Sequence, residues 1–353
     1  MNKKLRYLLF FPAFIYRMIT GVRNFLFDMK ILKSESFVLP VISVGNITVG
    51  GTGKTPFTEY LISELSRHFK IACLSRGYRR RTKGFIIART DSSPEETGDE
   101  PYQIKRKFPE TIIACDTDRR RGIRKLMALP HPPEVIILDD GFQHRYVKAD
   151  KHIVLVDYNR PIYRDHLLPM GRLRESAKNI RRADYIIVTK CPDIVKPIDI
   201  RLIIKNLNIR PYQKIFFSCM RYKNVRSLSE VANFLPPNPK NILCITGIAS
   251  PEPYYKYLKS TYNCNIHPVK YPDHHWYSSK DWEYIGKKFE NLPKENRFIF
   301  TTEKDAVRMQ NSDIPRPLKE NIFYIPIEPV FIHNKRNLIK ELYDRITQDR
   351  KDP

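Results

Sequence analysis

From residue 41 onward, short apolar runs alternate with longer stretches in which apolar residues recur at helical spacing. Apolar runs bounded by polar turns are typical of strands buried on both faces, as in parallel sheets. We expect such strands at Val41–Val44, Ile71–Leu74, Thr111–Ala114, Val135–Leu138, Ile153–Val156 and Tyr185–Thr189. Helical spacing between several of them, for example over Pro56–Phe69 and Asp99–Lys107, predicts an α/β fold with helices on both faces of a mostly parallel sheet.

Prolines become frequent around residues 195–215, and the strand pattern weakens there. A second set of apolar runs follows, at Ile215–Ser218, Ile242–Ile245, Asn265–Pro268, Phe298–Thr301 and Asn321–Ile325. This set predicts a second, smaller α/β domain, and Asn334–Ile346 has the spacing of a further helix. We therefore divide the chain into an N-terminal segment (1–33), a first domain (34–212), a second domain (213–332) and a C-terminal helix and tail (333–353).

The N-terminal segment 1–33 has a different pattern from the rest of the chain. It is dense in Leu, Phe, Tyr, Ile and Met, and carries seven basic residues against a single acid, Asp28. Its longest uncharged run, ten residues from Tyr7 to Tyr16, is too short to span a bilayer, which takes about 20 residues. No small-residue cleavage site follows, so a secretory signal is not expected. The pattern predicts an amphipathic helix in the membrane interface; the alternative is a helix packed on the protein's own core.

Composition narrows the choice of partners. The 353 residues are 42% hydrophobic, enough for the cores of about two domains. A formal net charge of +24 favours an anionic partner, such as a phospholipid surface, a phosphorylated substrate or nucleic acid. The sequence contains no recognisable nucleic-acid-binding module, so we expect no nucleic-acid partner. The six cysteines are widely spaced and form no C-x-x-C pair, which predicts buried free thiols rather than disulfides or a zinc site.

A glycine-rich turn follows the first expected strand and leads into Lys54 and Thr55. This order is typical of a phosphate-binding loop, G-x-x-x-x-G-K-[ST], although Thr48 stands where the first glycine is usual. Lys54 would reach the β- and γ-phosphates, and the Thr55 hydroxyl would bind Mg²⁺. We assign nucleotide binding to Thr48, Val49, Gly50, Gly51, Thr52, Gly53, Lys54 and Thr55.

The strand at Val135–Leu138 ends in two carboxylates, Asp139 and Asp140, with Gln143 and His144 beyond them. An acid at the end of a strand beside a phosphate-binding loop commonly holds Mg²⁺ or its water. Neighbouring residues in a strand point in opposite directions. One carboxylate would therefore address the metal and the other the substrate or the backbone.

Two further segments carry candidates for proton transfer, an aspartate in the first domain and an Asp-His pair in the second. Asp99 opens a predicted helix just before Pro101, and Asp273-His274 lies in the second domain. Asp is a good N-cap, so a capping role is the simple alternative for Asp99. A carboxylate and an imidazole brought together across a cleft would make a general base for an alcohol nucleophile.

Arginines recur near the expected strand ends, in clusters at Arg76 with Arg79–Arg81, at Arg119–Arg121, and at Arg172 and Arg174. Most arginines in such runs face solvent, but one in each cluster could bind a phosphate with two hydrogen bonds. The segment Thr189–Asp193 is similar to the N-K-x-D motif with which GTPases read guanine. Thr replaces Asn and the Asp comes one residue late, so guanine specificity is not expected.

Taken together, these motifs resemble those of the tetraacyldisaccharide 4'-kinase family, the lipid A 4'-kinases, along most of the chain. The resemblance rests on Ser43–Asn46, Gly50–Pro56, Leu74–Tyr78, Gly98–Pro101, Asp118-Arg119, Asp139–His144, Gly171–Glu175, Gly247–Pro251, Asp273-His274 and Thr302–Arg308. One departure is Arg172, where Pro is expected.

The resemblance implies an ATP- and Mg²⁺-dependent kinase with a P-loop NTPase-like fold. It would phosphorylate the 4'-hydroxyl of a tetraacyldisaccharide 1-phosphate to form lipid IVA, at the cytoplasmic face of a Gram-negative inner membrane. A monomer is expected. Implied catalytic residues are Asp99, His274, Lys54 and Asp140, and implied metal ligands are Thr55 and Asp139. Substrate binding falls to Arg76, Arg119, Gln143, His144, Arg174 and Glu175.

Two other classes of protein remain as alternatives. One is a P-loop GTPase or metallochaperone-like switch, which would show a different nucleotide preference and no lipid acceptor. The other is a membrane-bound nucleic-acid-binding ATPase, which the positive charge alone suggests.

Overall fold

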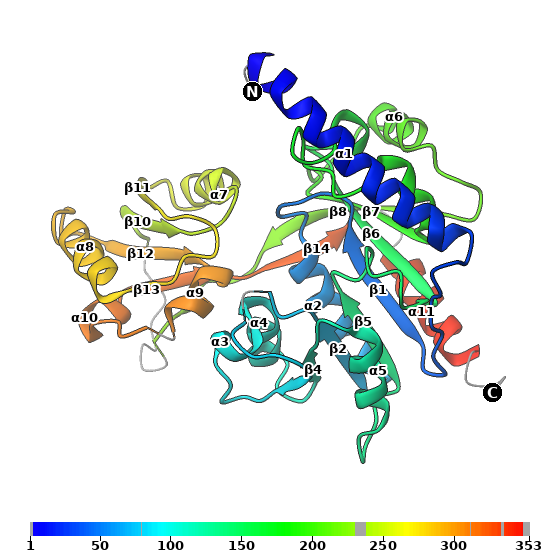
Figure 1. Ribbon diagram of the computed structural model, residues 1–353. Coiled ribbons are helices and arrows are strands. Elements are labelled where there is room, and N and C mark those ends of the chain that lie inside the picture. Colours follow the sequence, from blue (N-terminus) through cyan, green and yellow to red (C-terminus); the bar gives the residue numbers. More distant parts are fainter. Residues whose placement is uncertain (1–2, 79, 230–237, 311, 333–334, 349–353) are drawn as a thin grey trace. The chain divides into compact units, whose positions relative to one another are not determined.

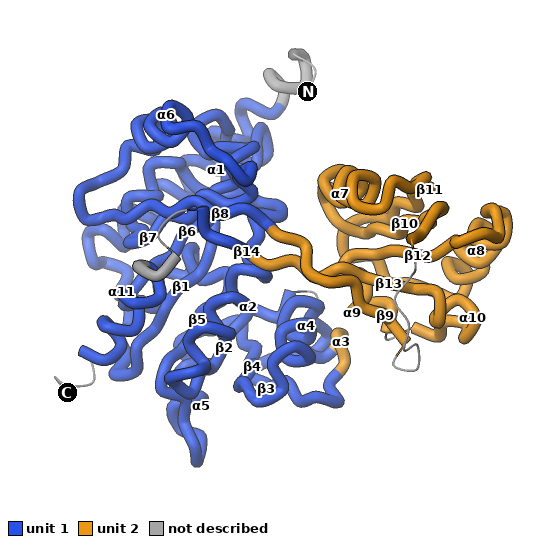
Figure 2. The backbone as a smooth tube through the Cα atoms, turned by 180° about the vertical axis from the view of Figure 1, so that it is seen from behind, with its two compact units in different colours: residues 1–92, 96–220, 329–353 blue, residues 93–95, 221–328 orange. Residues whose placement is uncertain are grey.

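The computed structural model describes residues 3–78, 80–229, 238–310, 312–332 and 335–348 (Figure 1). Arg79 and Asn334, both named above, lie outside the described residues. The chain forms two compact units, which Figure 2 distinguishes by colour. Unit 1 comprises residues 1–92, 96–220 and 329–353, and unit 2 comprises residues 93–95 and 221–328.

Unit 1 contains a nine-stranded sheet in the order β14-β8-β7-β6-β1-β5-β2-β4-β3. All neighbours from β8 to β4 run parallel, whereas β3 is antiparallel to β4. All six strands predicted for the first domain are confirmed, within two residues at each end. The strands are β1 (Val41–Asn46), β2 (Ile71–Ser75), β3 (Ile86–Ala88), β4 (Ile112–Cys115), β5 (Val135–Asp139), β6 (Lys151–Asp157), β7 (Tyr185–Thr189), β8 (Lys214–Tyr222) and β14 (Ile327–Phe331).

The prediction that Ile215–Ser218 belongs to the second domain is wrong. These residues lie in β8, which pairs in parallel with β7 and buries Phe216 and Phe217 in unit 1. The proline-rich stretch before it is no linker, because it includes helix α6 (Pro197–Leu207), which packs Ile203 and Leu207 into the same unit. The helix expected at 334–346 is α11 (Lys335–Gln348), and it also contributes to the core of unit 1.

Helices cover both faces of the large sheet, as the sequence predicts (Figure 1). Alternate residues of β5 show this: Val135 and Ile137 share a core cluster with α2 (Lys54–Leu65) and α11, whereas Ile136 and Leu138 share one with α5 (Arg119–Met127). The other helices are α1 (Lys3–Asp28), α3 (Pro94–Thr97), α4 (Asp99–Lys107), η1 (Ile162–Arg164) and η2 (Ala177–Arg182).

Strand β1 lies in the middle of the sheet, between β5 and β6. The chain leaves β1 through α2 toward β2 on one side and later builds β6, β7 and β8 on the other. Such a reversal of strand order opens a crevice at the carboxyl ends of the central strands, where ligands of α/β folds bind. The loops that follow β1, β2, β4, β5 and β7 therefore form the expected site.

Unit 2 is a smaller α/β body with a five-stranded sheet in the order β11-β10-β12-β13-β9. Alternate residues of β10 again face two different clusters: Leu243 and Ile245 one, Ile242 and Cys244 the other. Its strands are β9 (Arg226–Ser227), β10 (Asn241–Thr246), β11 (Asn265–Lys270), β12 (Arg297–Thr302) and β13 (Ile322–Ile325). Its helices are α7 (Glu252–Tyr262), α8 (Ser279–Glu290), α9 (Glu303–Met309) and α10 (Arg316–Lys319).

Two further predictions concern thiols and membrane spans. All six cysteines are free and buried, which confirms the prediction from their spacing. In the described part of the chain, no helix is long and apolar enough to cross a membrane. The longest helix, α1, has 26 residues, with Pro12 inside it.

Candidate active site

The loop between β1 and α2 has the backbone of a phosphate-binding loop. Gly50 and Gly53 adopt φ angles of 99° and 86°, a region that residues with a Cβ rarely enter. Gly53 is the N-cap of α2 and offers no side chain to cap it, so the first N–H groups of the helix face the space an anion would occupy. Thr48 forms an isolated β-bridge with Leu173, and the Val49 N–H donates to the Arg172 carbonyl (2.8 Å). Strand-like pairing at Thr48 explains why a glycine is not needed there.

We expect Gly53→Ala to destabilise the protein by about 1 kcal/mol or more, because alanine at this φ is strained. The new Cβ would also lie 2.5 Å from Met220 Cε, which can shift. Gly51→Ala is the matched control, because its φ is not positive and its Cβ would meet nothing within 4 Å. Chemical denaturation of both variants checks this, and equal stability of the two would contradict the strain at Gly53.

Residues at the end of β7 hold the same loop from the side. The Thr189 hydroxyl donates to the Thr52 carbonyl (2.8 Å). Lys190 bonds through Nζ to the Gly51 carbonyl and to Asp157 Oδ2, the latter at 2.9 Å. The segment that resembles a guanine-reading motif thus supports the phosphate-binding loop through its Thr and Lys. No local pattern in the sequence predicts this role, because it depends on β6 and β7 lying on the same side of β1 in the sheet.

Asp140 is the meeting point of two cations beside this loop. Arg174 Nη1 donates to both Asp140 oxygens, at 2.8 and 3.0 Å, and Lys54 Nζ lies 3.6 Å from Oδ1. Burial alone would raise the pKa of Asp140, but Lys54 and Arg174 outweigh it and hold that pKa below its usual range. The carboxylate is therefore charged at neutral pH and fixes the position of both cations.

Asp139 lies in a different environment from its neighbour. Its side chain is 1% exposed; Oδ1 accepts from the Thr58 hydroxyl (3.1 Å), and Oδ2 is buried without a hydrogen bond. Burial, together with Glu100 and Asp140, raises the pKa of Asp139 to about 7. A buried carboxylate oxygen without a donor fits Mg²⁺, which takes oxygen ligands and favours the charged carboxylate. The two acids thus differ in their surroundings, and their separate roles stay a prediction.

Arg119 and His144 lie near these two acids. Arg119 is buried at the start of α5, where its Nη1 donates to the Asp116 carbonyl (2.9 Å). Its positive charge interacts electrostatically with Asp140, Asp139 and Arg76. Burial and the nearby Arg119 lower the pKa of His144 to about 4, so this imidazole is neutral at physiological pH. His144 Nε2 is buried without a hydrogen bond. Arg76 is exposed.

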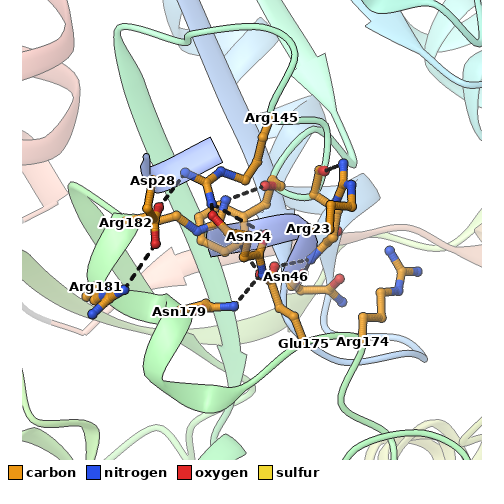
Figure 3. A network of polar contacts seen from close by, with 12 residues as sticks. Arg23, Asn24, Asp28, Asn46, Arg145, Arg174, Glu175, Asn179, Arg181 and Arg182 are labelled. Atoms are coloured by element: carbon orange, nitrogen blue, oxygen red, sulfur yellow. Dashed lines mark hydrogen bonds and ion pairs between the residues drawn. The ribbon is translucent and has the colours of Figure 1, made fainter. Parts of the chain in front are cut away.

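Glu175 and Gln143 are tied into the protein's own structure. Glu175 is buried and accepts hydrogen bonds from Asn24, Gln143, Asn179 and Arg182, at 2.6 to 3.3 Å (Figure 3). Gln143 Nε2 also donates to the Asn46 carbonyl (2.7 Å), at the end of β1. Both residues thus hold the loop after β5 to the end of β1. Their predicted contact with substrate stays a prediction.

The same network fastens α1 to the site (Figure 3). The Tyr16 hydroxyl donates to the Arg174 carbonyl (2.7 Å), and Arg23 donates to the Gln143 carbonyl (3.0 Å). Asp28, near the end of α1, is paired with Arg145 (2.7 Å) and Arg181 (3.4 Å). The polar face of α1 therefore packs on the loops that carry Arg174 and Gln143.

Asp99 is the first residue of α4, in unit 1. Gly98, with φ 90°, is the N-cap, so the simple alternative of Asp99 as the cap does not apply. A Cβ on Gly98 would lie 2.9 Å from the Tyr78 carbonyl oxygen, so only glycine allows this close packing of the two loops. The negative charge of the next residue, Glu100, helps to raise the pKa of Asp139, so the start of α4 lies near the two acids.

His274 belongs to unit 2, where α9 surrounds it with Lys304 and Arg308. Its predicted partner Asp99 belongs to unit 1, so the pairing of the two stays a prediction. The structure does bring together Lys54, Asp139, Asp140, Arg119, His144 and Arg174 at the carboxyl ends of the central strands.

The tetraacyldisaccharide-1-P 4'-kinase family, LpxK, matches residues 5–347 of the chain. The chain belongs to this family. A tetraacyldisaccharide 4'-kinase of Phocaeicola vulgatus is 46% identical over 333 residues, 92% of this chain and 91% of that protein. One of Flavobacterium psychrophilum is 42% identical over 349 residues, 97% of each. The crystal structure of LpxK from Aquifex aeolicus in complex with ATP has a TM-score of 0.75 and 31% identity, covering 97% of this chain and 99% of that one. Membership makes the chain an enzyme, a kinase of lipid A biosynthesis.

Proposed function

We propose that the protein transfers the γ-phosphate of ATP to the 4'-hydroxyl of a tetraacyldisaccharide 1-phosphate, giving lipid IVA. The observation that carries this proposal is the convergence of Lys54 and Arg174 on Asp140 beside a glycine loop at the end of β1. Phosphoryl transfer needs little covalent chemistry from the protein. It needs phosphates held in place and cations where charge develops, and this site has groups suited to both.

Mg²⁺ would be held by Asp139 and Thr55, together with the phosphates of ATP. The buried, unpaired Oδ2 of Asp139 supports this assignment. When bound, the ion neutralises charge on the β- and γ-phosphates. The backbone N–H groups of residues 48–53 would bind phosphate oxygens, and Lys54 would bind the β- and γ-phosphates. Arg76, Arg119 and Arg174 carry positive charge suited to the 1-phosphate or the transferred group.

The acceptor hydroxyl is a weak nucleophile until its proton has a destination. We assign its activation to Asp99 together with His274. A carboxylate at the start of α4 near Asp139, and a histidine held by α9, are suitable groups for a shared proton-transfer unit.

The exposed face of α1 supports binding to an anionic membrane surface. Tyr16 and Arg23 of this helix donate hydrogen bonds to loops of unit 1, whereas most of its large apolar side chains are exposed, which reverses the usual arrangement. Outward-facing residues at least 43% exposed are Phe10, Phe11, Phe14, Ile15, Met18, Ile19, Val22 and Phe25. An exposed apolar face of this size is typical of helices that lie in the membrane interface. We place the enzyme at the cytoplasmic face of the inner membrane, as a monomer without a nucleic-acid partner.

Replacing Phe10, Phe11 and Phe14 together by serine should weaken binding to anionic vesicles by about 10²-fold. Each buried phenylalanine is expected to contribute about 1 kcal/mol, and three such losses correspond to that factor. The substitutions leave the polar face of α1 on unit 1 intact, so folding should not change. Vesicle sedimentation measures the effect. Tyr284→Ser, which removes another half-exposed aromatic side chain, is the control, and an equal effect of both changes would place the membrane contact elsewhere.

One experiment tests the activity directly. The protein is incubated in detergent with disaccharide 1-phosphate and with ATP labelled at the γ-phosphate. We expect label in the lipid, and less with GTP than with ATP. Hydrolysis of GTP without transfer to the lipid would favour the GTPase alternative instead.

A further inference from the structure

His274 is held in an unusual backbone conformation in unit 2. Its φ is 64°, the left-handed region, which costs a residue other than glycine about 1 to 3 kcal/mol. The turn is fixed by a hydrogen bond from the His275 N–H to the Pro272 carbonyl (3.2 Å). It packs closely on Gly247, where an added Cβ would lie 3.3 Å from the Pro272 oxygen and 3.0 Å from Asp305 Oδ1. Strain that persists because its surroundings fix it is often found at functional sites.

Two cationic side chains of α9 reach the two ring nitrogens of His274. Arg308 Nη2 lies 3.2 Å from Nδ1, and Lys304 Nζ lies 3.4 Å from Nε2. A charged guanidinium or ammonium can only donate, whereas a neutral imidazole has one accepting nitrogen. Only one of these two contacts can therefore be a hydrogen bond.

The surroundings of Arg308 and Lys304 indicate which of the two makes the hydrogen bond to the His274 ring. Arg308 and Asp305 form a fully enclosed ion pair, 0% exposed on both sides, with Nη1 3.1 Å from Oδ1 and 3.1 Å from the Gly247 carbonyl. Asp305 Oδ2 is itself fixed by the Gly247 N–H (2.9 Å) and the Thr302 hydroxyl (2.7 Å). Lys304 is 27% exposed and also lies 3.4 Å from Asp273. The guanidinium is thus the shorter and the more rigid contact.

We propose that Arg308 is a positioning residue that fixes His274 as the neutral tautomer with its proton on Nε2. Nδ1 accepts from the buried guanidinium, and so Nε2 carries the N–H. Buried ion pairs are often no more stabilising than apolar residues of the same size. The Arg308–Asp305 ion pair therefore has a role other than stability, because it holds a hydrogen-bond donor in a fixed position against His274.

The tautomer determines what His274 can do in the reaction. Nε2–H donates a hydrogen bond to an anionic oxygen and does not accept a proton. The proton of the attacking hydroxyl then goes to a group other than His274, such as the Asp99 carboxylate, while His274 orients that carboxylate or a phosphate. This consequence rests on the proposed function, but the tautomer itself does not.

Nuclear magnetic resonance of the full chain, labelled with ¹⁵N- and ¹³C-histidine, tests the proposal. The protein has nine histidines, and comparison with His274→Gln assigns the resonance. Near about pH 8 an ordinary imidazole is neutral, so the two tautomers are distinguished directly. We expect the proton on Nε2 in the wild type and in Lys304→Met, and a mixture of tautomers in Arg308→Met. A proton on Nδ1 in the wild type would overturn the proposal, and so would an unchanged spectrum in Arg308→Met.

Removing Arg308 leaves Asp305 buried and unpaired, which can prevent folding. Asp305→Asn/Arg308→Met removes both charges and serves as the folded variant, with the same spectral result expected. In phosphoryl-transfer assays, Arg308→Met should lower kcat by about tenfold or more, with little change in the apparent KM for ATP. A wild type that transfers no phosphate to the lipid would refute the proposed function and leave the tautomer measurement valid.

Discussion

Replacing Lys54 by alanine is expected to abolish phosphoryl transfer while the fold survives, and Thr55→Ala is expected to do the same. Lys54 lies 3.6 Å from Asp140, at the start of α2, where a nucleotide's terminal phosphates would be bound. Loss of its charge removes stabilisation of the transferring group and should lower kcat by about 10²-fold or more, roughly 2.7 kcal/mol or above. Thr55→Ala removes the hydroxyl proposed to bind Mg²⁺. If weaker Mg²⁺ binding is its main effect, the activity of this variant should partly recover as the Mg²⁺ concentration is raised.

Steady-state kinetics with labelled ATP and lipid acceptor measure both variants, and circular dichroism checks their folding. Lys148→Ala, which removes an exposed lysine of the same unit, is the matched control and should behave as wild type. Turnover near the wild-type value in either site variant would show that residues 48–55 are not the phosphate-binding loop.

The central sheet could be predicted because buried strands of parallel sheets are short apolar runs, a signal present in the residues themselves. The membership of β8 could not be read in this way. Its run, Ile215–Ser218, is as apolar as the runs on either side of it, and only its pairing with β7 assigns it to unit 1. The nearby prolines suggested a boundary, yet they flank α6 inside the same unit.

In the site, residues that belong to a local motif can be predicted from the sequence, whereas the supporting role of Lys190 cannot. Asp140 directly follows β5 and Lys54 follows β1 after the glycine loop, so the sequence alone predicts both at one edge of the sheet. Lys190 reaches the Gly51 carbonyl from β7, across more than a hundred residues of sequence. An amphipathic helix at α1 is also predicted, but not that its Tyr16 and Arg23 donate hydrogen bonds to the Arg174 and Gln143 carbonyls. Such contacts depend on tertiary packing, which leaves no periodic signal.

Alanine at Asp99 and alanine at His274 should each lower kcat by about 10² to 10⁴-fold, with a smaller effect on the apparent KM for ATP. The two residues belong to different units of the chain. Acting as one unit, they would give the proton of the hydroxyl a destination while the phosphate is transferred. In this pair Asp99 would take the proton of the 4'-hydroxyl, and the Nε2–H of His274 would orient the carboxylate.

A double-mutant cycle on kcat distinguishes one unit from two independent groups. If Asp99 and His274 act together, the first substitution already removes what the second would remove, because parts of a unit are not additive. The double variant should then be little slower than the slower single variant. If the two free-energy losses add in full, the residues act separately, and the pairing is wrong. ATP hydrolysis without the lipid provides the control, since neither alanine should lower it as much as it lowers transfer to the sugar hydroxyl.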